Sequence, residues 1–441
     1  MQFRTKIAIV VFSTIIAFYA IVGSFMSKSG QAVAKGSQYA QLTIFDEVLA
    51  LIIRDYVDQP DIEKVRIGSL RGLAEGLDPY SAYLTPEQVK QYDPKAVRSE
   101  TGMVLSKVGG YAYIVTVVKG SPADQAGIRD GDFIEYVGKV PSRDLSLYDI
   151  HEFLSGQPGT SVEVRILHRG QSRKVSVARV KIAQPAIESR LEEPGIGYIR
   201  VTSLNPGKAS EVKSALKDLM AKGGQKVALD LRGTASGSME EALAVANLFI
   251  GSGTLARVIG KNGKETQAYN ADAAKVVFSG PLVVVMDRST AGPGEVIAAA
   301  IRDQKRGELV GERSFGAGSE QQLFYLSDGG ALLITTAKYA PVAGKPFMDE
   351  PISPTVKVER PVVAEVVIPG GDDDQDAEEK PEQPQAVTPK PLEPPVDDVM
   401  FKKALEVLKQ ASAKTQSVGK RATVWRVPAR IGVAEGYRIS T

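Results

Sequence analysis

The order of apolar and polar positions divides the chain into segments that favour different structures. Residues 7–25 are almost continuously apolar, residues 41–77 repeat apolar positions at helical spacing, and residues 102–181 form short apolar runs broken by turn residues. Between 186 and 359, continuous apolar runs alternate with amphipathic stretches, which is typical of an α/β layer around a buried sheet. The pattern predicts N-terminal helices, then a small β-rich domain, then an α/β core.

Helical spacing defines an N-terminal helical region, which we place at residues 41–95. One helix is predicted at 41–56 and a second at 62–77, because their apolar residues recur every three or four positions. Thr85 followed by Pro86 predicts the start of a third, shorter helix. Threonine accepts from the free N–H groups at a helix start, and proline fits the first turn.

The β-rich segment carries one long motif. Residues 120–138 read GSPADQAGIRDGDFIEYVG and follow a predicted strand at 114–118. The string resembles the signature of a PDZ domain, with its last glycine one position early. Ser146 begins the expected second helix of this domain, and Asp149 is placed for a capping-box contact. A PDZ domain is therefore expected over residues 96–183.

Three further motifs resemble those of the carboxyl-terminal processing peptidases, or tail-specific proteases. They are LDPYSAYL at 77–84, DRSTAGPGEVIAAAIRDQKRGELVGERSFGAGSEQ at 287–321 and GALLITTAKYAP at 330–341. The resemblance implies an α/β fold in which the PDZ domain precedes a ClpP/crotonase-like peptidase core at 186–360. It also implies a serine nucleophile that is activated by a lysine.

Both positions that this resemblance assigns to the dyad have lost their reactive groups. Aligning on Glu295 places the serine position at Gly292, and aligning on the segment 314–316 places the lysine position at Ala317. Covalent acyl transfer needs a nucleophile and a base within reach of it, and these two residues supply neither. Losing members of one catalytic unit lowers the rate by several orders of magnitude. The sequence therefore predicts a pseudopeptidase.

Other family positions around the site are partly retained. The resemblance implies supporting roles for Asp303 and Gln321, which are both present. The loop that would bind an oxyanion is expected at 230–237, where Gly237 is kept and Ser236 replaces a glycine. A Cβ in that turn can direct a backbone N–H away from the developing charge. Several departures around one site favour a natural loss of activity.

Two other functions stay open from the sequence alone. The chain could be an active serine endopeptidase that cleaves C-terminal tails through a relocated nucleophile, or a PDZ scaffold that binds no tail. Serines in loops mostly serve turns and caps. The serines and lysines that a relocated dyad would draw on are Ser236, Ser289, Ser314, Ser319, Lys305 and Lys338.

The PDZ domain is expected to bind protein or peptide C-termini. Such domains add an extended peptide to a sheet edge and hold its terminal carboxylate with backbone amides. The alternative is that the apolar residues concerned only fill the small core of the domain. The expected binding residues are Thr101, Gly102, Met103 and Val104 in one loop, and Ile150 and Leu154 on the second helix.

Composition excludes several functions. The 54 basic and 52 acidic residues nearly balance, so nothing favours a nucleic-acid partner. The chain has no cysteine, and its two histidines, His151 and His168, lie far along the sequence from the dyad positions. We therefore expect no disulfide, no metal site, no cofactor and no serine–histidine–aspartate triad.

The two ends of the chain predict export and a solvated tail. Arg4 and Lys6 precede the apolar run, so residues 1–26 are predicted to be a signal peptide or a membrane anchor. The body is then expected in a periplasm-like compartment, held at the inner membrane or secreted after cleavage. Residues 370–398 are an acidic, proline-rich linker, and residues 399–441 are a short helix with a basic tail. Homo-oligomers and pairing with an active relative both remain open.

Overall fold

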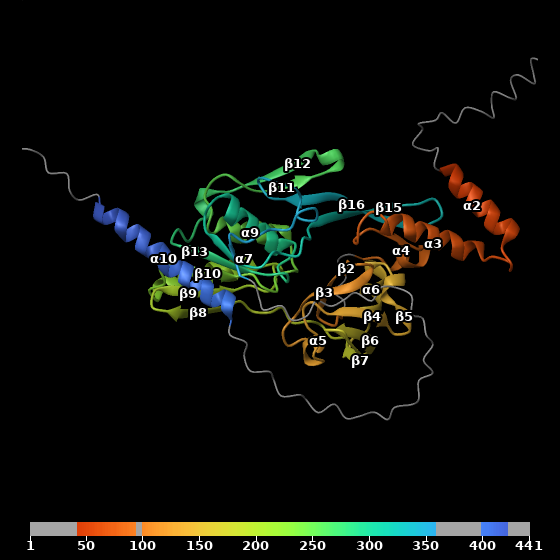
Figure 1. The fold of residues 1–441 in the computed structure, drawn as a ribbon, viewed down its shortest axis with the longest axis horizontal. Helices are drawn as coiled ribbons and strands as arrows, with labels where there is room; N and C mark the ends of the chain where they lie inside the picture. The colour runs from red at the N-terminus through yellow and green to blue at the C-terminus, as the bar shows by residue number, and fades with distance from the viewer. Residues whose placement is uncertain (1–41, 94–98, 359–397, 422–441) are drawn as a thin grey trace, which may run out of the picture. The chain divides into compact units, whose positions relative to one another are not determined.

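The structure is a computed structural model that describes residues 42–93, 99–358 and 398–421, with the side chains of the last segment described through residue 410 (Figure 1). The predicted signal or anchor, almost all of the acidic linker and the end of the basic tail lie outside these residues. Within the described ranges, no helix combines the length and apolarity needed to cross a bilayer. The chain divides into two compact units between residues 69 and 70.

Two helices form where helical spacing predicted them. Helix α2 spans Leu42–Asp55 and helix α3 spans Ile62–Glu75. In the second unit, strand β1 (Ala82–Leu84) leads into helix α4 (Pro86–Gln91). Thr85 and Gln88 form a complete capping box at the start of α4, which confirms the predicted helix start.

The PDZ domain is built on a six-stranded antiparallel sheet. Its strands follow the order β2-β3-β4-β6-β7, with β5 paired to β4. Ser146 and Asp149 form the capping box predicted for its second helix. The elements are β2 (Met103–Val108), β3 (Tyr111–Val117), α5 (Pro122–Gln125), β4 (Phe133–Val137), β5 (Val140–Pro141), α6 (Leu147–Leu154), β6 (Ser161–His168) and β7 (Gln171–Ala178).

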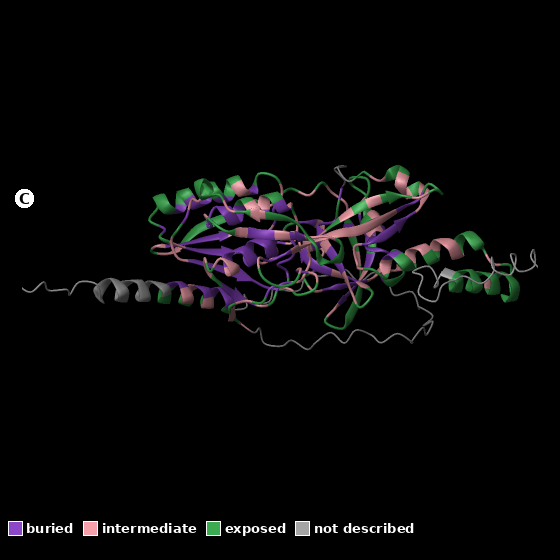
Figure 2. Cartoon of the chain, turned by 90° about the horizontal axis from the view of Figure 1, so that it is seen from above, coloured by how far each residue is buried: buried purple, intermediate pink, exposed green. Residues whose placement is uncertain are grey.

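The peptidase-like core is an α/β layer, as the alternating pattern predicted. Its main sheet has the order β17-β14-β13-β10-β9-β8, and only the pairing of β8 with β9 is antiparallel. The strands are β8 (Glu188–Glu193), β9 (Ile196–Arg200), β10 (Lys226–Asp230), β13 (Leu282–Met286), β14 (Glu308–Gly311) and β17 (Val356–Lys357). Most residues of the inner strands β9, β10, β13 and β14 are buried, whereas those of the edge strands β8 and β17 are exposed or half-buried (Figure 2).

Helices cover both faces of this sheet. Helices α7 (Lys208–Ala221), α8 (Met239–Asn247) and α9 (Pro293–Asp303) pack in the larger apolar cluster on one face. The other face is covered by α10 (Val399–Arg421), whose residues Met400, Phe401, Ala404 and Leu408 join strand residues in a second cluster. Helix α10 contacts β10, β13 and β14, and Figure 1 shows it beside β10 and β13. A second sheet joins β1, β11 (Thr254–Ile259), β12 (Glu265–Asn270), β15 (Ser319–Tyr325) and β16 (Ala331–Ala340).

Candidate active site

The site lies at the carboxyl ends of the parallel strands, where ligands bind in open α/β sheets. The loop after β10 supplies residues 231–238, and the loop after β13 supplies residues 287–292. The two loops are joined directly, because the Ala291 N–H donates to the Thr234 carbonyl at 2.9 Å. Residues far apart in the sequence are thereby held at one edge of the sheet.

Gly292 begins helix α9 in an unusual backbone conformation. Its φ is 49° and its ψ is −109°, a positive-φ geometry that favours glycine. A Cβ built at this residue meets no atom within 4 Å. The position therefore has space for a side chain, and only the backbone conformation would oppose one.

Glu295 ties the serine position to the lysine position. Its carboxylate is fully buried and accepts from the Gly292 N–H at 2.8 Å and the Ala317 N–H at 2.7 Å, both at Oε2. Oε1 accepts from the Ser314 hydroxyl at 2.5 Å and the Gly316 N–H at 2.9 Å. Burial raises the pKa of Glu295 to about 7, against the lowering effect of these hydrogen bonds.

Gly292 and Ala317 line one cavity of about 420 Å³. Gly237 and Gln321 line it too, so the structure brings four of the sequence-predicted site positions together. Its wall, drawn from the residues that the structure describes, includes no lysine, arginine or histidine, and its titratable side chains are Tyr80, Glu240 and Tyr339. The cavity therefore has no basic side chain beside a serine.

The serines near the site are engaged in structural contacts. Ser289 is buried and donates to Asp287 at 2.5 Å, while its oxygen accepts from the Gly233 N–H at 2.8 Å. The Ser314 hydroxyl donates to the Glu295 carboxylate. Ser319 lines the cavity, but its oxygen accepts from the Gln321 side chain at 2.7 Å. None of these contacts pairs a serine with a lysine or histidine, and the two serines that donate to carboxylates, Ser289 and Ser314, do not line the cavity.

The two candidate lysines, Lys305 and Lys338, and the remaining candidate serine, Ser236, are not positioned to form a relocated dyad either. Lys338 forms an ion pair with Asp349 at 2.6 Å, and neither Lys338 nor Lys305 lines the cavity. Ser236 uses its backbone carbonyl to accept from the Leu204 N–H at 2.8 Å. Its side chain lies at a neighbouring cavity.

The oxyanion loop is kept as a backbone turn. Gly237 has a φ of 119°, and a Cβ there would lie 2.2 Å from the backbone of Leu204, so the turn requires glycine. Pro293, which lines the same cavity as Gly237, follows Gly292. The residue after the nucleophile normally supplies an oxyanion donor in such elbows, and proline has no N–H. Proline at this position also fits the first turn of α9, and its identity alone shows that the donor is missing.

Asp303 and Gln321 occupy different surroundings. Asp303 accepts from the Val342 and Ala343 N–H groups at 2.9 and 3.3 Å, so it fixes the loop after β16. Gln321 donates to Ser319 and to the Thr335 hydroxyl at 3.2 Å and faces the cavity. Among the described residues, no group of three or more histidine, aspartate or glutamate side chains is placed to hold a metal.

The expected PDZ residues separate into two groups. Met103, Ile150 and Leu154 are buried in the core cluster of the PDZ domain, and Thr101 and Gly102 are also buried. Val104, in contrast, lines the cavity that holds Gly292 and Ala317. The binding role of these residues stays a prediction, and Val104 is the one that the structure places at the candidate site.

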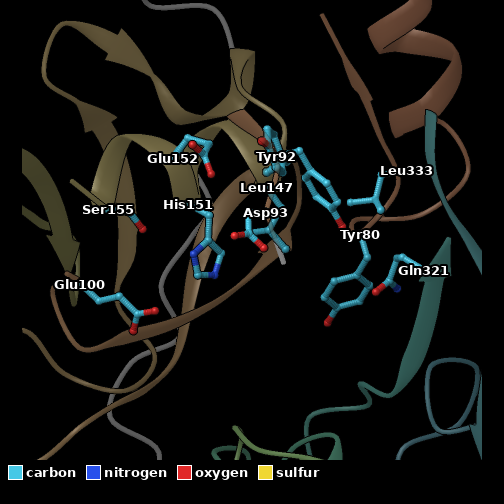
Figure 3. Close-up of a pocket in the computed structure, with 11 residues that line it drawn as sticks. Tyr80, Tyr92, Asp93, Glu100, Leu147, His151, Glu152, Ser155, Gln321 and Leu333 are labelled. Atoms are coloured by element: carbon cyan, nitrogen blue, oxygen red, sulfur yellow. The ribbon is translucent and has the colours of Figure 1, made fainter. Parts of the chain in front are cut away.

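A second cavity, of about 280 Å³, lies beside helix α6. Leu147 and His151 of α6 face Tyr80, Gln321 and Leu333 across it (Figure 3). Tyr80 and Gln321 also line the first cavity. The exposed side of the PDZ helix and the degenerate site are therefore neighbours, a relationship that depends on contacts between distant segments and that sequence spacing did not reveal.

Comparisons with known proteins agree with this architecture. Residues 195–358 match peptidase family S41, and residues 113–167 match the PDZ domain. The chain is 32% identical to the carboxy-terminal processing protease CtpA of Bacillus subtilis, over 71% of this chain and 68% of the relative. It is 26% identical to the carboxy-terminal-processing protease of Bartonella bacilliformis, over 78% of this chain and 82% of the relative.

A solved structure shows the same fold. The photosystem II D1 C-terminal processing protease aligns with a TM-score of 0.60 and 26% identity, over 73% of this chain and 93% of that one. A PDZ domain ahead of an α/β peptidase core is consistent with these matches. The chain belongs to the carboxyl-terminal processing peptidases of peptidase family S41.

Proposed function

We propose that this chain is a catalytically inactive carboxyl-terminal processing peptidase homologue that binds protein C-terminal tails. The observation that carries the proposal is the meeting of Gly292 and Ala317 at one cavity. At the two positions where a nucleophile and its base would stand, there is no group that can attack a carbonyl or accept a proton. Pro293 adds a missing N–H donor beside them.

Tail binding is supported by the cavities that the site retains. Glu295 keeps the helix start and the 314–317 loop in place without any reactive side chain. The PDZ helix α6 adjoins this cavity through Tyr80 and Gln321. An extended peptide added to a PDZ domain would therefore lie close to the former catalytic position.

We also propose that the protein works outside the cytoplasm. The support is the sequence pattern at residues 1–26, where two basic residues precede a long apolar run. The body would then be inner-membrane anchored in the periplasm, or secreted after cleavage. In either case its partners would be exported proteins with free C-termini, and a homo-oligomer or an active relative is a further possible partner.

The test combines hydrolysis with binding. The purified full chain is incubated with casein and with a tailed peptide, and it is exposed in parallel to a fluorophosphonate probe for activated serines. We expect neither turnover nor labelling, together with measurable binding of the tailed peptide. Turnover that Ser289→Ala or Ser236→Ala abolishes would instead support the relocated-nucleophile endopeptidase. Absence of peptide binding would support the scaffold alternative.

A further inference from the structure

Arg200, at the carboxyl end of strand β9, has no bonded counter-ion among the residues that the structure describes. Its Nε atom is buried and has no hydrogen-bond partner. No other residue in the described parts of the chain forms a hydrogen bond or ion pair with its guanidinium. Partial burial of an unpaired cation is unfavourable, so such a group marks a position where an anion would bind.

The two carboxylates that line the same cavity as Arg200, those of Asp130 and Glu188, each have another partner. Glu188 lies opposite Arg200 in the β8–β9 register, but its Oε1 lies 3.9 Å from Lys119. Asp130 accepts from the Val117 N–H at 2.8 Å. Both carboxylates share a cavity with Arg200 and contribute negative charge to it without neutralising the guanidinium by contact.

This third cavity has a volume of about 370 Å³ and lies where the PDZ domain meets the core. Thr116 and Lys119 come from the PDZ side, while Arg200 and Ser236 come from the core. Its volume lies within the range of small-ligand sites, roughly 300–1,000 Å³. The cavity is therefore large enough for the last residues of a peptide.

The Arg200 cavity adjoins the degenerate site. Val104 lines both of them. Ser236 lines the Arg200 cavity, and the residues on either side of it in the chain, Ala235 and Gly237, line the site cavity. One turn of the oxyanion loop thus forms the border between the two spaces.

The charges of the cavity select among anions. A guanidinium binds a carboxylate through two parallel hydrogen bonds. Asp130 and Glu188 disfavour an ion with several negative charges, such as phosphate, and can accept from N–H donors. The C-terminus of a polypeptide combines one negative charge, which can pair with Arg200, with backbone N–H groups, which can donate to Asp130 and Glu188.

We propose that Arg200 binds the free α-carboxylate of a polypeptide tail, whose preceding residues cross the 235–237 turn into the cavity of Gly292 and Ala317. The inference rests on the proposed tail-binding function and assigns the carboxylate to the core instead of the 101–104 loop. Arg200 is a binding residue in this assignment and has no catalytic role.

The experiment measures binding of fluorescein-labelled peptides that end in three alanines, as the free acid and as the C-terminal amide, to the full chain. Arg200→Gln removes the charge at similar side-chain length. Ala186→Trp adds bulk at an exposed loop residue of the cavity wall and leaves Arg200 in place. Lys217→Gln, on the exposed side of α7, is the charge-matched control. Acetate and inorganic phosphate serve as competitors.

We expect Arg200→Gln to weaken free-acid binding about 10- to 100-fold, which is the effect of losing a charged hydrogen bond, and to leave amide binding unchanged. Ala186→Trp should weaken binding as well, Lys217→Gln should not, and acetate should compete better than phosphate.

Unchanged free-acid binding in Arg200→Gln would overturn the assignment and leave tail binding intact, with the carboxylate at the 101–104 loop. Equal competition by phosphate would make the cavity a general anion site. No binding of either peptide by the natural chain would overturn both proposals.

Discussion

The backbone N–H groups of Gly292 and Ala317 donate to the same atom, Oε2 of Glu295, at 2.8 and 2.7 Å. One buried carboxylate thereby connects the start of helix α9 with the loop that carries the lysine position. These bonds use only backbone donors, so they do not depend on the side chains at 292 and 317. The scaffold can therefore persist after the reactive groups are lost.

Glu295→Ala should destabilise the core. The substitution leaves three backbone N–H groups near the site without their acceptor, and each buried unsatisfied donor costs about 1–3 kcal/mol. We expect a loss of roughly 3–5 kcal/mol in the free energy of unfolding, measured by chemical denaturation followed by circular dichroism. The matched control is Glu240→Ala, an exposed glutamate at the same cavity, which should change stability by less than about 1 kcal/mol. Equal effects in the two variants would show that the carboxylate does not hold the site together.

The pH dependence of stability should carry a contribution from Glu295. Burial raises its folded-state pKa to about 7, above the ordinary glutamate value of 4.5. At pH values between about 4.5 and about 7, the Glu295 carboxyl group is protonated in the folded protein but ionised in the unfolded chain. Its contribution to the free energy of unfolding is therefore favourable at low pH and is lost as pH rises from about 4.5 to about 7. The expected change is on the order of 3 kcal/mol.

Glu295→Gln provides the measurement for that contribution. Glutamine does not titrate, so the difference in unfolding free energy between the natural chain and this variant should change across pH 4.5–7 and level off above it. A difference that stays constant over this range would show that Glu295 keeps an ordinary pKa in the folded protein.

Restoring the dyad alone should give little activity. Gly292→Ser with Ala317→Lys returns a nucleophile and a base, and space for the serine exists. Pro293 still lacks an N–H, and a missing oxyanion donor lowers kcat by about 10²–10³-fold. Adding Pro293→Ala should raise hydrolysis of a tailed peptide by a similar factor. If the double variant reaches the rate of the triple one, the missing N–H at 293 is irrelevant, and Ser236 becomes the next residue to restore.

Helix α10 should contribute strongly to the stability of the core. The ring of Phe401 meets that of Tyr198 at 5.0 Å between centroids, and Asp398 at the helix start pairs with Arg232 at 2.8 Å. Phe401→Ala should lower the free energy of unfolding by about 3 kcal/mol. Phe153, which is 45% exposed in the PDZ domain, gives the control Phe153→Ala with a small effect. Similar effects for both would mean that α10 is not an integral layer of the fold.

Much of the fold could be predicted from local sequence. The PDZ signature, the capping residues Thr85 and Ser146 and the alternation of the core depend on short-range spacing, and the structure confirms each of them. The positions Gly292 and Ala317 followed from motif alignment, and the structure places them at one cavity. Local patterns were sufficient because these features are encoded within a few residues of one another.

Features that depend on distant contacts could not be predicted. From the sequence, Glu295 only aligns the motif, since nothing there shows that the 314–317 loop returns to its carboxylate. The sequence left two roles open for Met103 and Ile150, because an apolar residue at the correct spacing has the same pattern in a groove and in a core; the structure buries both, and their binding role stays a prediction. Whether Arg200 has a hydrogen-bond partner depends on the position of every neighbouring element, so its unpaired Nε atom could be found only in the folded structure.

The central claim is that the site binds but does not cleave, and hydrolysis of a tailed peptide by the purified full chain tests it most directly. Because Gly292 and Ala317 offer no nucleophile and no base, the account predicts no product above the background of a matched mock purification and no serine labelling by a fluorophosphonate. Sustained turnover that co-purifies with the chain, and that disappears in Ser236→Ala or Ser289→Ala, would contradict it.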